Sequence, residues 1–318
     1  MSFISFVVLF MLQELQKTIK DPTHLEGVGL HTGIKVNLYL KPAEVNSGII
    51  FKRTDIESDK NIIEANYKNV SSSALCTKIQ NSHGISVSTI EHLMAAFYGE
   101  GIDNVLVEID GPEVPIMDGS AFDFVELIKV AEIQKQKEPK KFIKVKKKIE
   151  IYDGEKYISI EPFANDLIID FEIVYKNQLI KTRRKEFKLS NGDLTSVYNS
   201  RTFCLYEDID KIRSMGLAKG GSLENAIVVS ESKILNEGGL RNRHEFVDHK
   251  ILDCLGDLML AGHRIFGHVK TSQGGHQLTG NLLKKFFSSK SNWEFDDFEG
   301  KQKDPKDNTL QNPIAVNA

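Results

Sequence analysis

The sequence predicts an α+β fold that is organised as two similar halves. Residues 35–40 alternate between apolar and polar side chains, and residues 104–109 form a short aliphatic run, as strands do. Residues 245–258 instead place their apolar side chains at helical spacing. The order of helix, strand, glycine turn and helix occurs in the first half and again in the second. Two such halves would face each other, with their polar helices at the seam.

The length of the chain favours two domains, because 318 residues exceed the usual size of one hydrophobic core. Lysine-rich residues 134–148 are interpreted as a solvated linker that leads into a new strand, in preference to a binding patch. We therefore expect an N-terminal domain at 16–137 and a C-terminal domain at 141–287. Residues 1–15 are expected to be a dispensable extension, and residues 288–318 a polar tail that is only partly ordered.

Composition excludes several classes of function. A net charge of -3 provides no large basic field, so nucleic acid is not expected as a partner. Three widely spaced cysteines argue against a disulfide framework and favour a reducing, cytoplasmic location. Residues 3–12 are apolar, but they are too short to span a bilayer and lack a secretory cleavage site. Met11 offers a second start, and membrane tethering by the first residues is the minor alternative.

Strand alternation, helical spacing and glycine turns define the expected elements. In the first half these are strands at 35–40 and 85–88, a helix from 91 to about 98, a strand at 104–109 and a helix from 121 to about 134. In the second half, strands are expected near 143–152, 156–161 and 167–175. A strand at 203–207, a helix at 208–215 and a strand at 225–230 follow. The last elements are a helix from 245 to about 262, a strand at 265–272 and a helix that ends at about 287.

His249, Asp253 and Asp257 follow one another at intervals of four residues, so they form a polar stripe on an otherwise apolar helix. An imidazole and a carboxylate one helical turn apart can bind a single divalent ion. The alternative is a solvated face, which acidic residues on a helix usually form. Spacing alone leaves both interpretations open.

Glu91 and His92 begin the first helix of the N-terminal half. One interpretation is structural, because Ser88 and Glu91 have the spacing of a capping box and His92 would be an ordinary first-turn histidine. The other is catalytic, because an acid beside a histidine at the start of a buried helix can supply a base next to a metal ligand.

If the two halves face each other, His92, His249 and Asp253 make a set of two histidines and one carboxylate. This set is typical of a catalytic zinc, whose fourth position is left for water. Zinc lowers the pKa of bound water towards about 7 and polarises a carbonyl group, which favours hydrolysis of an amide or ester.

Three further residues could complete such a site. Glu91 could accept the proton of the water, and His276, on a double-glycine turn, could protonate the leaving nitrogen. A hydroxyl group such as that of Thr202 could donate a hydrogen bond to the oxyanion. The residues alone therefore indicate a zinc hydrolase.

Six motifs strengthen this interpretation because they occur together and in a fixed order. They lie at 26–33, 88–93, 115–121, 200–203, 220–222 and 249–257. Together they closely resemble the UDP-3-O-acyl-N-acetylglucosamine deacetylase family, the zinc amidases of lipid A biosynthesis in Gram-negative bacteria. The resemblance runs from about residue 16 to 287 and covers nearly the whole chain.

The resemblance implies two similar domains, each a layer of helices against a β-sheet, with the active site at their junction. It implies hydrolysis of the N-acetyl group of UDP-3-O-acyl-N-acetylglucosamine, which gives the free amine and acetate in the committed step of lipid A biosynthesis. One Zn²⁺ per chain is expected, with Fe²⁺ as the alternative metal. The acylated UDP-sugar is the expected partner, without a stable protein partner and at most near a membrane surface.

The functional residues of the family match positions of this chain. The zinc ligands of the family match His92, His249 and Asp253, and its general base matches Glu91. The histidine that acts as general acid or electrostatic stabiliser matches His276. The oxyanion-stabilising threonine matches Thr202. Asp257 matches an acid that orients the catalytic histidine. Lys250 matches a lysine near the diphosphate of the substrate.

Further contacts with substrate are expected from Leu30, Thr32, Phe203 and Tyr175. Residues 203–230 match an inserted β-α-β unit that forms an apolar passage for the fatty acyl chain, although core packing would explain its apolar residues equally well. Gln273 departs from the family, which often has a basic residue there.

Two rival functions follow from the same residues. The first is a related zinc amidase that acts on another acylated sugar nucleotide. The second is a non-catalytic protein that binds a nucleotide sugar or a lipid and whose polar stripe holds no metal.

Overall fold

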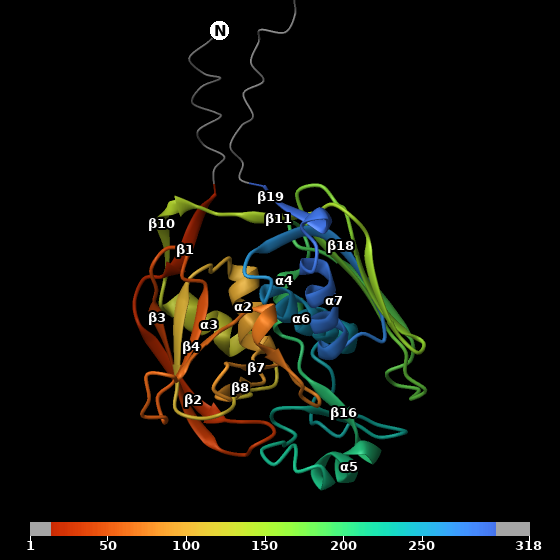
Figure 1. Ribbon diagram of the computed structural model, residues 1–318. Helices are drawn as coiled ribbons and strands as arrows, with labels where there is room; N and C mark the ends of the chain where they lie inside the picture. The colour runs from red at the N-terminus through yellow and green to blue at the C-terminus, as the bar shows by residue number, and fades with distance from the viewer. Residues whose placement is uncertain (1–13, 297–318) are drawn as a thin grey trace, which may run out of the picture.

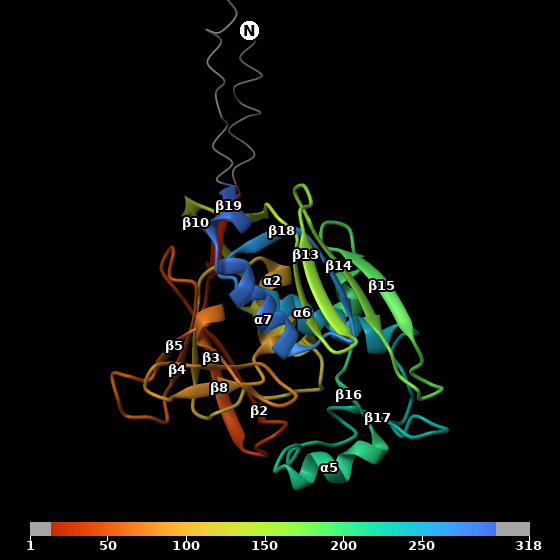
Figure 2. The ribbon, with the colours of Figure 1, turned by 45° about the vertical axis from the view of Figure 1, so that its right-hand side comes forward.

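The computed structural model describes residues 14–296, and the remaining residues of the expected extension and tail lie outside this range. The chain forms two outer β-sheets with a layer of helices between them (Figure 1). Turning the molecule shows the same helices enclosed between the sheet of the first half and that of the second (Figure 2). The α+β prediction is confirmed.

The N-terminal sheet has five strands around a buried central strand. Its order is β2 (Thr23–Val28), β3 (Lys35–Pro42), β9 (Val105–Ile109), β4 (Ile49–Arg53) and β5 (Ile62–Glu64). Strand β9 runs antiparallel to β3 and parallel to β4. Alternate residues of β3, Val36, Leu38 and Leu40, are fully buried, as the period-two pattern predicts.

The C-terminal half repeats this arrangement. The corresponding strands are β12 (Ile149–Asp153), β13 (Lys156–Glu161), β18 (Arg264–Ser272), β14 (Leu167–Ile173) and β15 (Arg183–Lys188). Strand β18 is again antiparallel to one neighbour, β13, and parallel to the other, β14. The two halves therefore share strand order and direction, which supports the repeated order of elements in the sequence.

Five helices lie between the sheets. They are α2 (Glu91–Glu100), α3 (Phe122–Val130), α4 (Leu194–Tyr198), α6 (Glu245–Met259) and α7 (His276–Phe287). Helices α2 and α6 cross with almost no space between their backbones. A Cβ atom built on Gly256 of α6 would lie 1.9 Å from the carbonyl oxygen of Glu91. Glycine at 256 therefore permits the two polar helices to meet.

Two smaller sheets lie at the lower end of the helix layer in Figure 1. One consists of β6 (Val70–Ser71), β7 (Lys78–Gln80) and β8 (Ser86–Ser88), with η1 (Tyr67–Asn69) before it. The other is the expected insert, in which β16 (Phe203–Leu205) and β17 (Ile227–Val229) pair in parallel and η2 (Tyr206–Asp208) and α5 (Ile209–Ser214) connect them. The β-α-β prediction for 203–230 is confirmed.

One local prediction was wrong, and the first residues of the expected tail are ordered. Helix α3 ends at Val130, and residues that were predicted as helix and linker form β10 (Ile133–Pro139), which pairs with β1 (Leu15–Ile19). The side chains of β10 are mostly exposed, so the strand carries no apolar alternation that the sequence could reveal. Beyond Ser288, η3 (Lys290–Asn292) and β19 (Trp293–Asp296) follow, and β19 pairs with β11 (Phe142–Val145). The start of the expected tail is therefore part of the sheet.

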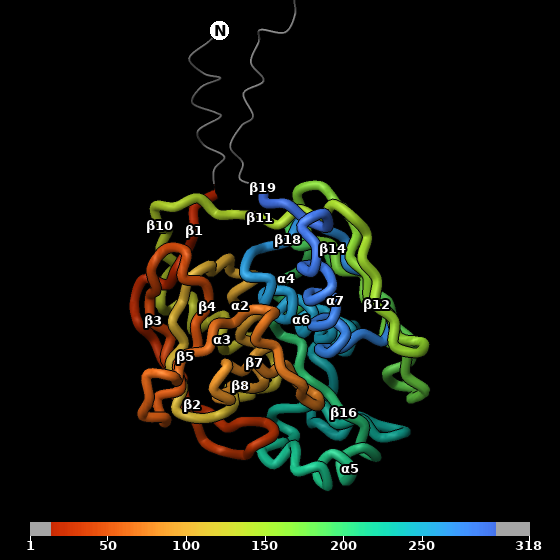
Figure 3. Tube along the Cα trace, in the orientation of Figure 1, coloured from red at the N-terminus to blue at the C-terminus, as the bar shows by residue number. Residues whose placement is uncertain are grey.

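The path of the chain is plain in the Cα trace, where the first and last described residues lie close together at one end of the molecule (Figure 3). Within residues 14–296, no helix has both the length and the apolar character that crossing a membrane requires. The cysteines Cys76, Cys204 and Cys254 are all free thiols. The division into domains at about residues 137–141 stays a prediction.

The crossing of α2 and α6 generates a test. We expect Gly256→Ala to lower the free energy of unfolding by about 1–3 kcal/mol or more, because the added methyl group meets backbone that cannot move aside. Gly280→Ala in α7 is the control, because its methyl group would lie 3.3 Å from a side-chain atom of Val70 and alanine favours a helix. Urea unfolding of both variants measures the difference, and equal stabilities would contradict the role of Gly256.

Candidate metal centre and active site

Helices α2 and α6 bring two imidazoles and one carboxylate together. His92 lies in the first turn of α2, and His249 and Asp253 lie one turn apart on α6. The Nε2 atoms of His92 and His249 are 3.5 Å and 3.4 Å from Asp253 Oδ1. Potential ligand atoms of all three residues lie within 4.8 Å of one another, and all three side chains are buried. The predicted convergence of these residues is therefore present in the fold.

The donor set fits a divalent cation. Asp253 Oδ1 is buried and has no hydrogen-bond partner within residues 14–296, although a buried carboxylate oxygen ordinarily has one. It faces two imidazole nitrogens, which are the preferred partners of zinc beside a carboxylate. A cation held by these three atoms would satisfy the unpaired oxygen.

The protonation of the imidazole of His249 also suits a metal ligand. Its Nδ1 atom donates to the carbonyl oxygen of Ser200 at 3.0 Å, which leaves Nε2 without a proton and directed at Asp253. Burial lowers the pKa of His249 to about 3, so the ring is neutral at neutral pH.

Asp253 is held in its charged form. Burial alone would raise the pKa of Asp253, but the neighbouring His249 and Lys250 outweigh burial and lower it well below its ordinary value. The Nζ atom of Lys250 donates to Asp253 Oδ2 at 2.8 Å, so this lysine holds the carboxylate oxygen that is turned away from the imidazoles. Its ammonium group also lies 5.8 Å from the centre of the Phe203 ring.

Glu91, His276 and Asp257 form a second group beside the first. The Nδ1 atom of His276 lies 3.0 Å from Asp257 Oδ2, and its Nε2 atom lies 3.7 Å from Glu91 Oε1. Thr77 fixes both carboxylates, because its backbone N–H donates to Glu91 Oε2 at 2.9 Å and its hydroxyl donates to Asp257 Oδ1 at 2.5 Å. The histidine is thus placed between two positioned acids.

The pKa values of this group differ from ordinary ones. Burial alone would lower the pKa of His276, but the carboxylates of Asp257 and Glu91 raise it to about 10. Burial raises the pKa of Glu91. The site therefore combines a charged imidazole with a carboxylate that is more basic than usual, which is an arrangement suited to general acid–base chemistry.

The structural interpretation of Glu91 was wrong. Ser88 does not cap helix α2, since its hydroxyl donates to the carbonyl oxygen of Pro112. Thr89 has a φ of 57°, a left-handed conformation that turns the chain sharply before the helix begins. The Glu91 carboxylate accepts from Thr77 instead of the backbone of Ser88, which directs it towards His276.

A large pocket of about 940 Å³ adjoins the site and is lined by most of the predicted substrate contacts. The sequence-predicted residues in its lining are Leu30, Tyr175, Thr202, Phe203, Lys250 and His276. Leu205, Ile209 and Ile212 of the insert also line it, whereas Met215 is 55% exposed and lies outside the lining. The pocket combines an apolar wall with polar groups near His276, as sites for amphipathic small molecules do.

Thr32 does not line this pocket. Its hydroxyl and its backbone N–H both donate to Glu113 Oε2 at 2.7 Å. Glu113 is completely buried and also accepts from the backbone of His31 and the hydroxyl of Thr89. The structure therefore gives Thr32 a part in holding the glycine turn at 27–33 against the start of α2.

Sequence reasoning missed Thr77, Glu113 and His31. The first two act by fixing other residues, and no motif spacing separates them from ordinary polar residues. His31 is 7% exposed, lines the pocket and has two ring nitrogens without hydrogen-bond partners in the described part of the chain. Its position within the 26–33 motif was the one available signal.

A second group of ligating residues, Asp170, Glu186 and His268, lies on the C-terminal sheet. Arg184 donates to both oxygens of Asp170, and Glu186 is exposed to solvent. This group therefore has the character of an ion-pair network, in contrast to the unpaired oxygen of Asp253.

Comparison with known proteins agrees with this geometry. Residues 16–288 match the model of the family described as LpxC, UDP-3-O-acyl N-acetylglycosamine deacetylase. The protein named UDP-3-O-acyl-N-acetylglucosamine deacetylase in Haemophilus ducreyi is 42% identical to this chain, over 92% of this chain and 96% of the relative. The protein of that name in Shewanella violacea is 43% identical, over 91% of this chain and 95% of the relative. The relative of that name in Actinobacillus succinogenes is 42% identical over 95% of this chain and 99% of its own length. The chain belongs to the UDP-3-O-acyl N-acetylglycosamine deacetylase family.

Proposed function

We propose that the chain binds one Zn²⁺ through His92, His249 and Asp253 and hydrolyses the acetamide of UDP-3-O-acyl-N-acetylglucosamine. The observation that carries this proposal is the unpaired, buried Oδ1 atom of Asp253 between two imidazole nitrogens. The names of the relatives give the substrate and the reaction. The products are the free amine and acetate.

The bound metal supplies a Lewis acid that lowers the pKa of a water molecule and polarises the acetamide carbonyl. Glu91 accepts the proton of the attacking water, a role that its raised pKa favours. His276 carries the proton that the departing amine needs, and Asp257 keeps the ring charged and oriented. Glu91 can return its proton to His276 across the 3.7 Å between Oε1 and Nε2, which restores both groups.

Thr202 donates to the developing oxyanion. Its backbone is fixed from both sides, because its N–H donates to Gly119 and its carbonyl oxygen accepts from Ile227. The adjacent Arg201 forms a buried ion pair with Glu245 at the start of α6, with 2.8 Å between Nε and Oε1. These contacts tie Thr202 to the helix that carries His249 and Asp253, as a preorganised donor requires.

The large pocket accommodates the rest of the substrate. Leu205, Ile209 and Ile212 of the insert receive the fatty acyl chain, because they provide its apolar wall. Tyr175 offers an aromatic face to the nucleotide sugar, and Lys250 offers a positive charge to the diphosphate. We place the reaction in the cytoplasm, on the support of three free cysteines, and take Fe²⁺ as the alternative metal.

Metal content tests the ligand set. We expect about one zinc per chain in the purified protein, and its loss in Asp253→Asn because the amide cannot supply the charge that binds the cation. His268→Ala removes a histidine from the second cluster and is the control that should keep the metal. Elemental analysis measures both. Retention of zinc by the Asp253 variant, or loss of zinc from the His268 variant, would show that the metal binds at another site.

Replacement of the proposed base tests its role. Glu91→Gln keeps the size of the side chain and an oxygen for the Thr77 N–H, so the fold should persist. We expect kcat for deacetylation to fall by about 10²–10⁴-fold, the usual contribution of a general base. The exposed Glu44→Gln is the matched control and should keep full activity. An active Glu91→Gln variant that binds zinc normally would exclude the assignment.

The charge on His276 predicts a pH dependence. Because its pKa is raised to about 10 from the ordinary 6.5, the ring stays protonated at neutral pH and loses its proton as the pH rises through about 10. We therefore expect kcat/KM to fall at alkaline pH in the wild type, and the residual activity of His276→Gln to lack this fall. His83→Gln, which replaces an exposed histidine, should keep it. An unchanged alkaline fall in His276→Gln would assign it to another group.

A further inference from the structure

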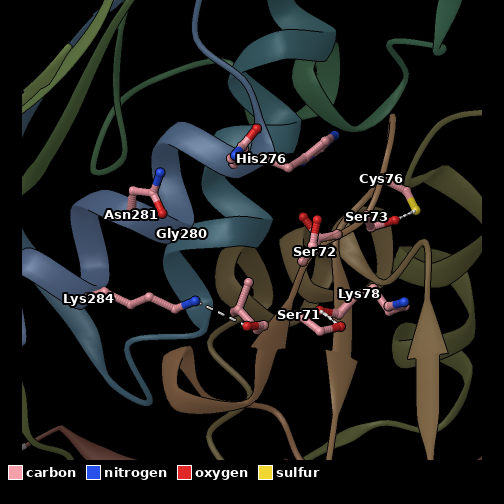
Figure 4. Close-up of a pocket in the computed structure, with 12 residues that line it drawn as sticks. Ser71, Ser72, Ser73, Cys76, Lys78, His276, Gly280, Asn281 and Lys284 are labelled. Carbon is pink, nitrogen blue, oxygen red and sulfur yellow. Dashed lines mark hydrogen bonds between the residues drawn. The ribbon is translucent and has the colours of Figure 1, made fainter. Parts of the chain in front are cut away.

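A second, smaller cavity reaches His276 from another side. It has a volume of about 130 Å³ and lies between helix α7 and the segment that connects β6 and β7 (Figure 4). Ser73, His276 and Gln277 line both this cavity and the large pocket, so the two meet at the proposed general acid. We call it the serine cavity, after Ser71, Ser72 and Ser73 in its wall.

The wall of the serine cavity combines polar and apolar surface and carries one positive charge. Hydroxyl and amide groups from the serines, Gln277 and Asn281 line it together with Val70, Cys76 and Gly280. Lys284 adds an ammonium group, whereas the side chain of Lys78 is directed away from α7 (Figure 4), and no aspartate or glutamate belongs to the lining. Within residues 14–296 Lys284 forms no ion pair, and its Nζ atom donates only to the carbonyl oxygen of Val70, at 3.2 Å. Such a cavity attracts a small anion.

The proposed reaction makes a small anion at this position. Its two products differ greatly in size, because the acylated nucleotide amine fills the large pocket while acetate has only four heavy atoms. On the proposed mechanism acetate would form between the metal ligands and His276, and an amine still bound in the large pocket would lie across the way out through that pocket. The serine cavity has room for it, since 130 Å³ far exceeds the roughly 10–15 Å³ that one water needs.

We propose that the serine cavity binds acetate and is the route by which this product leaves while the acylated amine is still bound. Lys284 holds the carboxylate by charge, and Ser72 and Asn281 donate hydrogen bonds to it. No bond is made or broken in this step. The inference rests on the proposed deacetylation, because that reaction is the source of the acetate.

Product inhibition tests Lys284. We expect Lys284→Gln to raise the inhibition constant of acetate by roughly 1.5- to fivefold, the range for one ion pair of ordinary surface strength. The KM for the acylated substrate should not change, because Lys284 does not line the large pocket. Lys285→Gln, which removes an exposed charge outside the cavity, is the matched control. Chloride keeps the ionic strength constant in every assay.

A steric variant tests the route. Ser72 is exposed, so Ser72→Trp should fold while its ring fills the serine cavity. We expect weaker inhibition by acetate and a lower kcat, because the product leaves more slowly. Ser82→Trp places the same ring at an exposed position outside the cavity and should have neither effect.

Direct binding separates this inference from the proposed function. Line broadening of ¹³C-labelled acetate by the zinc-loaded protein reports binding without any turnover, and it should weaken in the lysine and tryptophan variants. Inhibition and broadening that are the same in wild type and all variants would overturn the serine cavity as an acetate site. A wild-type protein that binds acetate through Lys284 but never deacetylates the substrate would instead overturn the proposed function.

Discussion

The contact between helices α2 and α6 at Gly256 determines where every reactive group lies. The Glu91 carbonyl occupies the space that any side chain at position 256 would need. Because the two backbones touch there, the first turn of α2 presents Glu91 and His92 directly to the two turns of α6 that carry His249, Asp253 and Asp257. A larger distance between α2 and α6 would put the ligand atoms of His92, His249 and Asp253 beyond the reach of one cation.

Burial of so many charges is costly unless each has a partner, and the site meets this condition almost completely. Lys250 holds one oxygen of Asp253, Thr77 and His276 hold Asp257, and the Thr77 amide holds Glu91. The one remaining unpaired ligand oxygen is Asp253 Oδ1. The network therefore lacks one positively charged partner, and it lacks it at Asp253 Oδ1, where two imidazole nitrogens converge.

The sequence predicted best what depends on local spacing. His249 and Asp253 share one helix, so their approach follows from four-residue spacing alone, whereas the approach of His92 needed either the fold or the resemblance. Thr77 and Glu113 were missed because they act across the fold, through a backbone amide and through a carboxylate that closes the turn of Thr32. Strand β10 was missed for another reason. Its pairing with β1 uses backbone hydrogen bonds and exposed side chains, which leave no pattern in the sequence.

The two halves of the chain share one strand order, yet each contributes different residues to the active site. In both sheets the central strand, β9 or β18, follows one of the two crossing helices and leads into a turn that approaches the seam. The first of these turns carries Glu113, which fixes the glycine turn around His31, and the second ends at His276. Burial lowers the pKa of His31, and the carboxylate of Glu113 opposes this shift. The charge on His276, at the end of the second turn, lowers the pKa of His31 further, so the two turns interact electrostatically. The equivalent positions therefore have different roles, because one half shapes the wall of the pocket while the other supplies the charged group at its base.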